Sequence, residues 1–118
     1  MSTIKITRCW RPLVHIGDNR KPTTPILAYR RRAPGERAPF QFAVVRNWTA
    51  WRTAMTGTVP TRSQLRVALG RMVPLVCGTI GAELARQCGA TINVYPLRGK
   101  QIYGPDRLPQ TKIVTISD

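Results

Sequence analysis

The segment from Thr61 to Gly89 carries the most regular apolar spacing in the chain. Its apolar side chains recur every three or four residues, which places them on one face of an α-helix. They are Leu65, Leu69, Met72, Val76, Ile80 and Leu84. Thr61 or Ser63 is suited to cap the start of this helix, and Gly89 is suited to end it. Pro74 removes a backbone donor in the middle, so we expect either one kinked helix or two helices that break near Val73.

The segments on both sides of this helical region alternate between apolar and polar residues, as β-strands do. The predicted strands are residues 3–7, 25–30, 40–46, 91–97 and 111–117. The span 25–46 predicts a hairpin-like pair. Its aromatic and β-branched second half is typical of a central strand.

The remaining segments are predicted to connect these elements. Residues 11–25 are rich in proline and contain a Gly-Asp-Asn turn, so they predict a loop or a short edge strand. Residues 31–39 and 98–110 predict loops because they combine proline, glycine and arginine. Residues 47–55 predict a short helix capped by Asn47.

A strand-rich half, a helical region and a second strand-rich half predict one α+β domain over residues 1–118. In this prediction a small mixed or antiparallel sheet packs on one long helix, which is straight or kinked at Pro74. Pro-rich loops connect the elements.

The charge of the chain is strongly one-sided, with 19 lysine and arginine residues against 5 aspartate and glutamate residues, a net charge of +14. Such an excess opposes compaction unless an anionic partner neutralises it. Most of these cations are arginines, which bind phosphate and carboxylate groups with two parallel hydrogen bonds. A GC-rich genome also enriches arginine over lysine, but this bias does not explain the shortage of acids.

A basic cluster with interleaved aromatic residues extends from residue 20 to residue 52. Its candidate polyanion contacts are Arg20, Lys21, Arg30, Arg31, Arg32, Arg37, Arg46 and Arg52. Arg62 and Arg66, four residues apart, are further candidates that either line a second basic face or are simply solvated. The candidate stacking residues are Tyr29, Trp48 and Trp51. Cations bind the backbone of nucleic acids and flat rings stack on bases. We therefore expect the loop after residue 30 to bring three adjacent arginines together at one phosphate or to splay them along a backbone groove. The alternative for the tryptophans is a place in the core.

Catalytic chemistry has little support in the sequence. The five acids are scattered, His15 is the sole histidine, and no serine or cysteine lies in a nucleophile motif. The three cysteines, Cys9, Cys77 and Cys88, lack the spacing of a zinc site and predict reduced, buried side chains. We therefore predict no enzymatic activity, no catalytic residues, no cofactor and no metal.

The sequence shows neither a signal-peptide pattern nor an apolar run long enough to span a membrane. The first ten residues lack an apolar signal-peptide core, and the longest apolar run, residues 73–82, is too short to span a bilayer. We expect a location in the cytoplasm or within a virus particle, with no membrane partner.

Three functions fit these features. The first is a non-enzymatic binding protein that contacts a DNA or RNA backbone within a larger nucleoprotein or virion assembly; no recognised nucleic-acid motif supports reading of sequence. The second is a viral or phage structural subunit whose arginines contact acidic protein surfaces. The third is a small inhibitor that binds an acidic site on a host enzyme.

Overall fold

The computed structural model describes residues 3–17, 24–36, 38–49, 55–73, 78–99, 102–103, 109–110 and 112–118. Its strands are β1 (Thr3–Ile6), β2 (Arg11–His15), β3 (Ile26–Arg31), β4 (Phe40–Val45), β5 (Met55–Thr58), β6 (Thr91–Pro96), β7 (Ile102–Tyr103), β8 (Pro109–Gln110) and β9 (Lys112–Ser117). Its helices are α1 (Arg62–Arg71) and α2 (Thr79–Cys88). Strands therefore dominate the part of the chain that is described.

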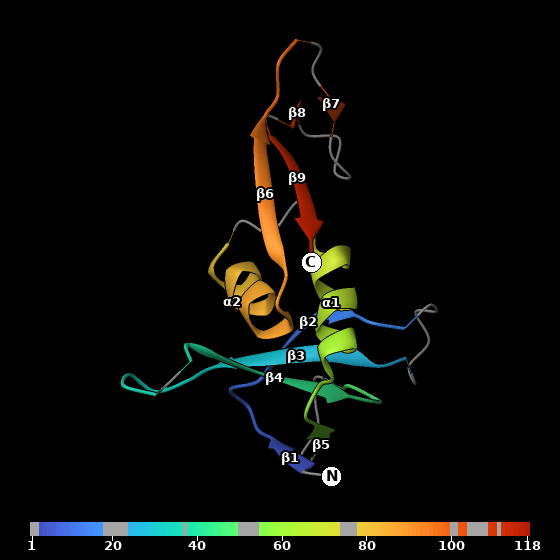
Figure 1. Ribbon diagram of the computed structural model, residues 1–118. Coiled ribbons are helices and arrows are strands. Elements are labelled where there is room, and N and C mark those ends of the chain that lie inside the picture. The colour runs from blue at the N-terminus through green and yellow to red at the C-terminus, as the bar shows by residue number, and fades with distance from the viewer. Residues whose placement is uncertain are drawn as a thin grey trace.

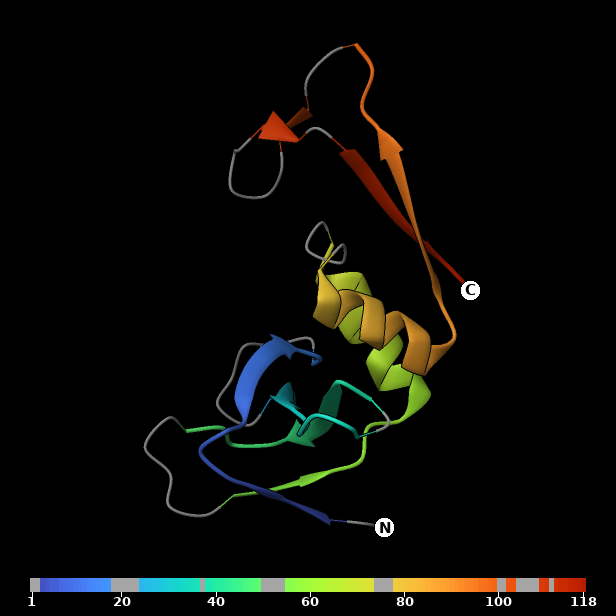
Figure 2. The same ribbon diagram turned by 90° about the vertical axis from the view of Figure 1, so that its left-hand side faces the viewer.

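The main sheet has five antiparallel strands in the order β1-β5-β4-β3-β2. Its centre is the β3–β4 hairpin, which pairs continuously from Ile26 opposite Val45 to Arg31 opposite Phe40. The predicted hairpin over residues 25–46 and its central second strand are thus confirmed. Both helices lie on one side of this sheet (Figures 1 and 2).

Alternation along the hairpin divides the apolar residues between two cores, because successive strand side chains point to opposite faces. The larger core, on the helix side, contains Leu27, Phe40, Phe42, Val44, Leu65, Ala68, Leu69, Met72, Leu84, Ala85, Cys88 and Val114. The smaller core, on the opposite side, contains Ile6, Trp10, Ala28, Ala43 and Val45. Both faces of the central hairpin are therefore buried.

The two helices share the predicted apolar stripe. Thr61 caps α1 with a capping box, in which its side chain accepts from the Gln64 amide and the Gln64 side chain accepts from the Thr61 amide. Gly89 ends α2 in the left-handed conformation, with φ of 72°. Leu65 and Leu69 of α1 and Leu84 of α2 are buried in the same core.

The predicted architecture of a sheet packed on one long helix is wrong. The described structure is mostly β, and the helical region is two short helices instead of one. The first ends at Arg71, with the Met72 amide bonded to the Leu69 carbonyl, and the second starts at Thr79. The break expected near Val73 falls in this interval. Pro74 and Val76 lie outside the described residues.

Of two further local predictions, the first needs correction and the second, a short edge strand within residues 11–25, is confirmed. Residues 47–49 are not helical, and Asn47 has a positive φ of 56°, so the short helix capped by Asn47 does not begin there. Residues 11–15 form an edge strand, β2, with an irregularity between Pro12 and Val14. Proline is tolerated there because an edge strand has one side free of ladder hydrogen bonds.

Strands β6 and β9 form a separate two-stranded ribbon that projects away from the helices (Figure 2). Val114, in the middle of β9, is buried in the larger core, whereas the next cross-strand pair, Tyr95 and Ile113, is 53% and 41% exposed. Among the described residues beyond this pair are the two-residue strands β7 and β8, which pair with each other inside the segment 98–110 that was predicted to be a loop. The radius of gyration is 15.6 Å, whereas a compact chain of this length has about 13.5 Å. The ribbon accounts for this elongation.

The two described helices are each too short and too polar to cross a membrane. Each has ten residues, about half the length that a bilayer requires.

Among the described residues, the buried carboxylate is that of Glu83. The Glu83 side chain is 7% exposed, and the Arg86 Nε donates to both of its oxygens at 3.0 and 3.1 Å. The Gln87 amide donates to it at 2.9 Å. These hydrogen bonds, led by that of Arg86, hold the pKa of Glu83 below its ordinary value of 4.5, although burial opposes them.

Glu83→Gln should therefore lower the free energy of unfolding by about 1 kcal/mol at pH 7, because it weakens charge-assisted hydrogen bonds. A carboxyl whose pKa is lower in the folded state than in the unfolded state stabilises the fold at pH values above the unfolded-state pKa. This stabilisation is lost as the pH falls through the folded-state pKa. The difference between the two proteins should therefore narrow as the pH falls below the ordinary pKa of glutamate, about 4.3. Urea denaturation at pH 7 and pH 3 measures it.

The matched control is Glu36→Gln. The Glu36 carboxylate is 42% exposed and contacts Arg32 at 4.0 Å, so its neutralisation should change the stability little at either pH. An equal loss for Glu83→Gln at both pH values would contradict the assignment of the stabilisation to the carboxylate charge.

Candidate polyanion-binding site

Adjacent arginines leave the β3–β4 hairpin on opposite faces. The Arg30 Nε donates to the Gln41 side chain at 2.7 Å, and its guanidinium lies 5.8 Å from the Trp10 ring, on the side of the smaller core. The Arg31 guanidinium lies 5.8 Å from the Phe40 ring, on the helix side. The expectation that the three arginines converge in a turn is therefore wrong, because Arg30 and Arg31 belong to the strand.

Arg32 follows the strand and extends its pairing, since its amide donates to the Pro39 carbonyl at 2.9 Å. Its guanidinium lies 4.0 Å from the Glu36 carboxylate. The Arg32 Nε is buried without a hydrogen-bond partner. This arginine is thus partly engaged by an acid of its own loop.

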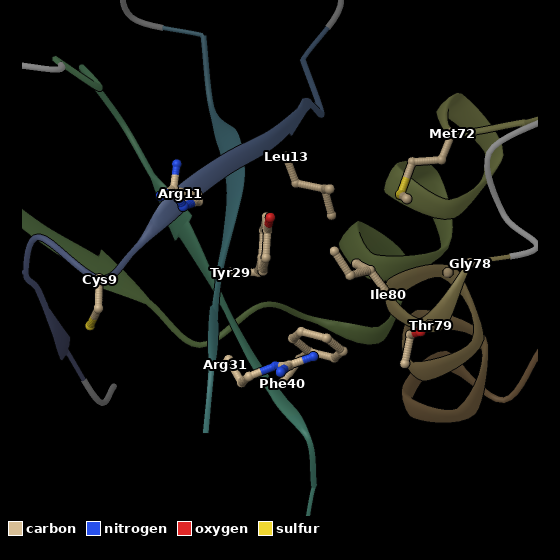
Figure 3. A pocket seen from close by; sticks show the side chains of 11 residues that line it. Cys9, Arg11, Leu13, Tyr29, Arg31, Phe40, Met72, Gly78, Thr79 and Ile80 are labelled. Atoms are coloured by element: carbon tan, nitrogen blue, oxygen red, sulfur yellow. The ribbon is translucent and has the colours of Figure 1, made fainter. Parts of the chain in front are cut away.

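A cavity of about 570 Å³ lies between the sheet and the helices, on the side of Arg31 (Figure 3). It is lined by Cys9, Arg11, Leu13, Tyr29, Arg31, Phe40, Met72, Gly78, Thr79, Ile80 and Gly81. Leu13 and Tyr29 from the sheet face Ile80 and Met72 from the helices (Figure 3). The volume is within the range of about 300–1,000 Å³ that is usual for ligand sites.

Strand register places two cations in this cavity. Arg11 pairs with Tyr29 across the β2–β3 ladder, and Arg31 pairs with Phe40 across the β3–β4 ladder. Residues directly opposite one another share a face of the sheet. Tyr29 and Phe40 themselves form an edge-to-face pair with ring centroids 6.0 Å apart. Two arginines and two rings therefore project from the same part of the sheet.

The helix wall adds hydrogen-bond donors to the cavity. Helix α2 starts at Gly78, which supplies no side-chain cap, and its first turn contains no acidic residue. The first helical hydrogen bond of this turn runs from the Ala82 amide to the Gly78 carbonyl. The amides of Thr79, Ile80 and Gly81 precede it, so they have no acceptor within the helix.

The described acids are already paired elsewhere. Glu36 contacts Arg32, Glu83 contacts Arg86, and Asp118 contacts Arg66. Among the described residues no acid lines the cavity or pairs with the arginines at its rim. The same part of the chain contains no group of histidine, cysteine or acidic side chains that is suited to a metal ion.

The predicted pair Arg62 and Arg66 lies apart from this cavity, on α1. The Arg62 Nε donates to the Cys88 carbonyl at 2.8 Å, at the C-terminal end of α2. The Arg66 Nε bonds the Asp118 carboxylate at 3.0 Å. Together with Ser63 they line a second, smaller depression. Arg62 thus has a structural role in joining the two helices.

Two other predicted contact residues, Arg46 and Trp48, also do not line this cavity. Arg46 is exposed just after β4, and Trp48 is half-buried against the smaller core, as the core alternative expected. Of the cysteines, Cys9 is exposed, which corrects the prediction of a buried thiol, and Cys88 is buried. The predicted residues that lie outside the described part of the chain are Arg20, Lys21, Arg37, Arg52, Trp51 and Cys77.

Sequence reasoning did not single out Arg11 or Thr79. Arg11 and Leu13 alternate as strand residues do, but the neighbouring prolines left a loop and a short edge strand as alternatives over residues 11–25. Thr79 follows Gly78, and their position at a helix start depends on the break between the helices. The alternation at residues 11–15 is the signal that could have found the first of them.

Comparison with protein-family models, with curated proteins and with solved structures finds no significant match for this chain. The function must therefore be argued from the geometry above.

Arg62→Ala should lower the free energy of unfolding by about 1–2 kcal/mol, because it leaves the last carbonyl of α2 without its donor. Arg66→Ala should cost less than about 1 kcal/mol, because its ion pair with Asp118 is exposed. Urea denaturation of both variants measures the difference. A larger loss for Arg66→Ala would contradict the structural role of Arg62.

Proposed function

We propose that this protein is a non-enzymatic, strongly basic protein that binds the backbone of DNA or RNA without reading its sequence. It acts as a component of a larger nucleoprotein or virion assembly, in the cytoplasm or within a virus particle. The binding surface is the cavity between the sheet and α2, with Arg11 and Arg31 at its rim.

The observation that supports this proposal is the distribution of charge pairs. Each described acid is held by Arg32, Arg66 or Arg86. Arg11 and Arg31 are exposed and have no acid beside them among the described residues. Cations that no described acid neutralises attract an anion from outside, and arginine is especially suited to phosphate.

The proposal predicts that affinity for a 20-nucleotide DNA or RNA strand falls steeply with salt, as counterions are released from phosphates. Arg11→Gln/Arg31→Gln should weaken binding about tenfold and reduce the log–log salt slope by about 1.4, since each phosphate contact of a single strand contributes about 0.7. Fluorescence anisotropy between 50 and 300 mM NaCl, a range chosen around about 150 mM physiological salt, measures both effects.

The matched control is Arg98→Gln/Lys112→Gln, which removes the same charge from two exposed positions, one just after β6 and one at the start of β9. It should lower the affinity much less than the cavity variant does. Equal losses for the two double variants would indicate diffuse attraction by net charge, and no binding to either nucleic acid would contradict the proposal.

A second candidate is the structural subunit that contacts acidic protein surfaces. The observation that favours it is the projecting ribbon, which leaves Tyr95 and Ile113 about half exposed as a cross-strand pair. Apolar pairs on an extended element are typical of protein contacts. Light scattering distinguishes the two candidates, because an assembly subunit forms stable oligomers in nuclease-treated, nucleic-acid-free solution.

A further inference from the structure

The cavity combines apolar walls with cations at its rim. Binding a nucleic-acid backbone requires the cations but does not require the apolar walls. Leu13, Met72 and Ile80 give it aliphatic walls, and Tyr29 gives it a ring. A phosphate alone binds in an open, polar groove. A cavity of about 570 Å³ with this lining fits a ligand that has both a flat, weakly polar part and an anionic part.

The cation beside these walls is held in position. The Arg31 guanidinium lies against Phe40, which is 5% exposed and fixed in the larger core (Figure 3). Tyr29 contacts the same ring edge-to-face. A guanidinium held on an aromatic ring keeps its donors free for a phosphate and offers a plane on which a base stacks.

The phosphate end is placed by the remaining lining residues. Arg11 reaches the cavity from β2, across the ladder from Tyr29. Thr79, Ile80 and Gly81 line the opposite wall, where backbone amides without helical acceptors add donors. These backbone amides assist the two arginines in binding a phosphate. Without the arginines they would not form a binding site.

We propose that this cavity binds one unpaired nucleotide of a single strand. The base lies between Tyr29 and the apolar wall around Ile80, and the phosphates on its two sides bind Arg31 and Arg11. This inference rests on the proposed function and adds that the bound nucleic acid is single-stranded. A paired base is stacked inside a duplex and does not reach the cavity, so a single strand binds more tightly than a duplex.

The test compares a 12-nucleotide single strand with the duplex of the same sequence in fluorescence anisotropy at 150 mM NaCl. The single strand should bind at least about tenfold more tightly, a ratio typical of one base–aromatic stack. Thr79→Trp places an indole at the cavity from an exposed position in the first turn of α2. It should remove most of the single-strand preference and change duplex affinity less than twofold.

Val67→Trp is the matched control, because Val67 is 41% exposed on α1 and does not line the cavity. It should leave both affinities unchanged, and urea denaturation confirms that both tryptophan variants fold. Arg31→Lys keeps the charge but loses the planar fork, so it should also reduce the single-strand preference.

The outcomes separate the two proposals. Equal affinity for strand and duplex, with no effect of Thr79→Trp on either, would overturn the nucleotide cavity and leave backbone binding intact. No affinity for strand or duplex would overturn both proposals. Adenosine monophosphate that binds as tightly as the strand, with the same loss in Thr79→Trp, would overturn the assignment to a strand and indicate a free-nucleotide site.

Discussion

The pairing of β3 with β4 is the contact on which the rest of the structure depends. Its six residue pairs bring Leu27 beside Val44 on the helix side and Ala28 beside Ala43 on the other side. A shift of one residue would exchange the two faces of a strand, so both cores require this register. The same register fixes Arg30 and Arg31 on opposite faces. The hairpin therefore determines packing and charge placement together.

The cavity follows from how the helices cover this hairpin. Helix α2 packs on the larger core through Leu84 and Ala85, while its first turn lines the cavity. Opposite this turn the sheet contributes the side chains of Leu13, Tyr29 and Phe40. Arg11 and Arg31 lie beside them and are exposed. The proposed site is thus the place where apolar side chains of the sheet adjoin exposed arginines.

The sequence predicted much of the local structure. The alternation at residues 3–7, 25–30, 40–46, 91–97 and 111–117 identified five of the strands. Thr61 and Gly89 marked helix ends because their cap chemistry is local. The architecture was wrong because the apolar stripe from Leu65 to Leu84 has the same spacing whether one helix carries it or two short helices share it. Only tertiary packing decides between these arrangements.

The site was less predictable for a related reason. Arg31 was named because it belongs to a visible cluster, but its separation from Arg30 depends on how far β3 extends. Arg11 enters the cavity only through the β2–β3 register, which prolines in the same segment obscured. Charge composition identifies the class of partner, whereas strand boundaries decide which cations act together.

The order of strands and helices along the chain has a consequence for folding during translation. The five strands of the main sheet are complete by Thr58, whereas the helices that cover its inner face run from Arg62 to Cys88. At about 5–20 residues per second, Leu27, Phe42 and Val44 stay uncovered for one to several seconds during translation. This interval is a window for aggregation or chaperone capture, and slower synthesis of the helical segment would lengthen it.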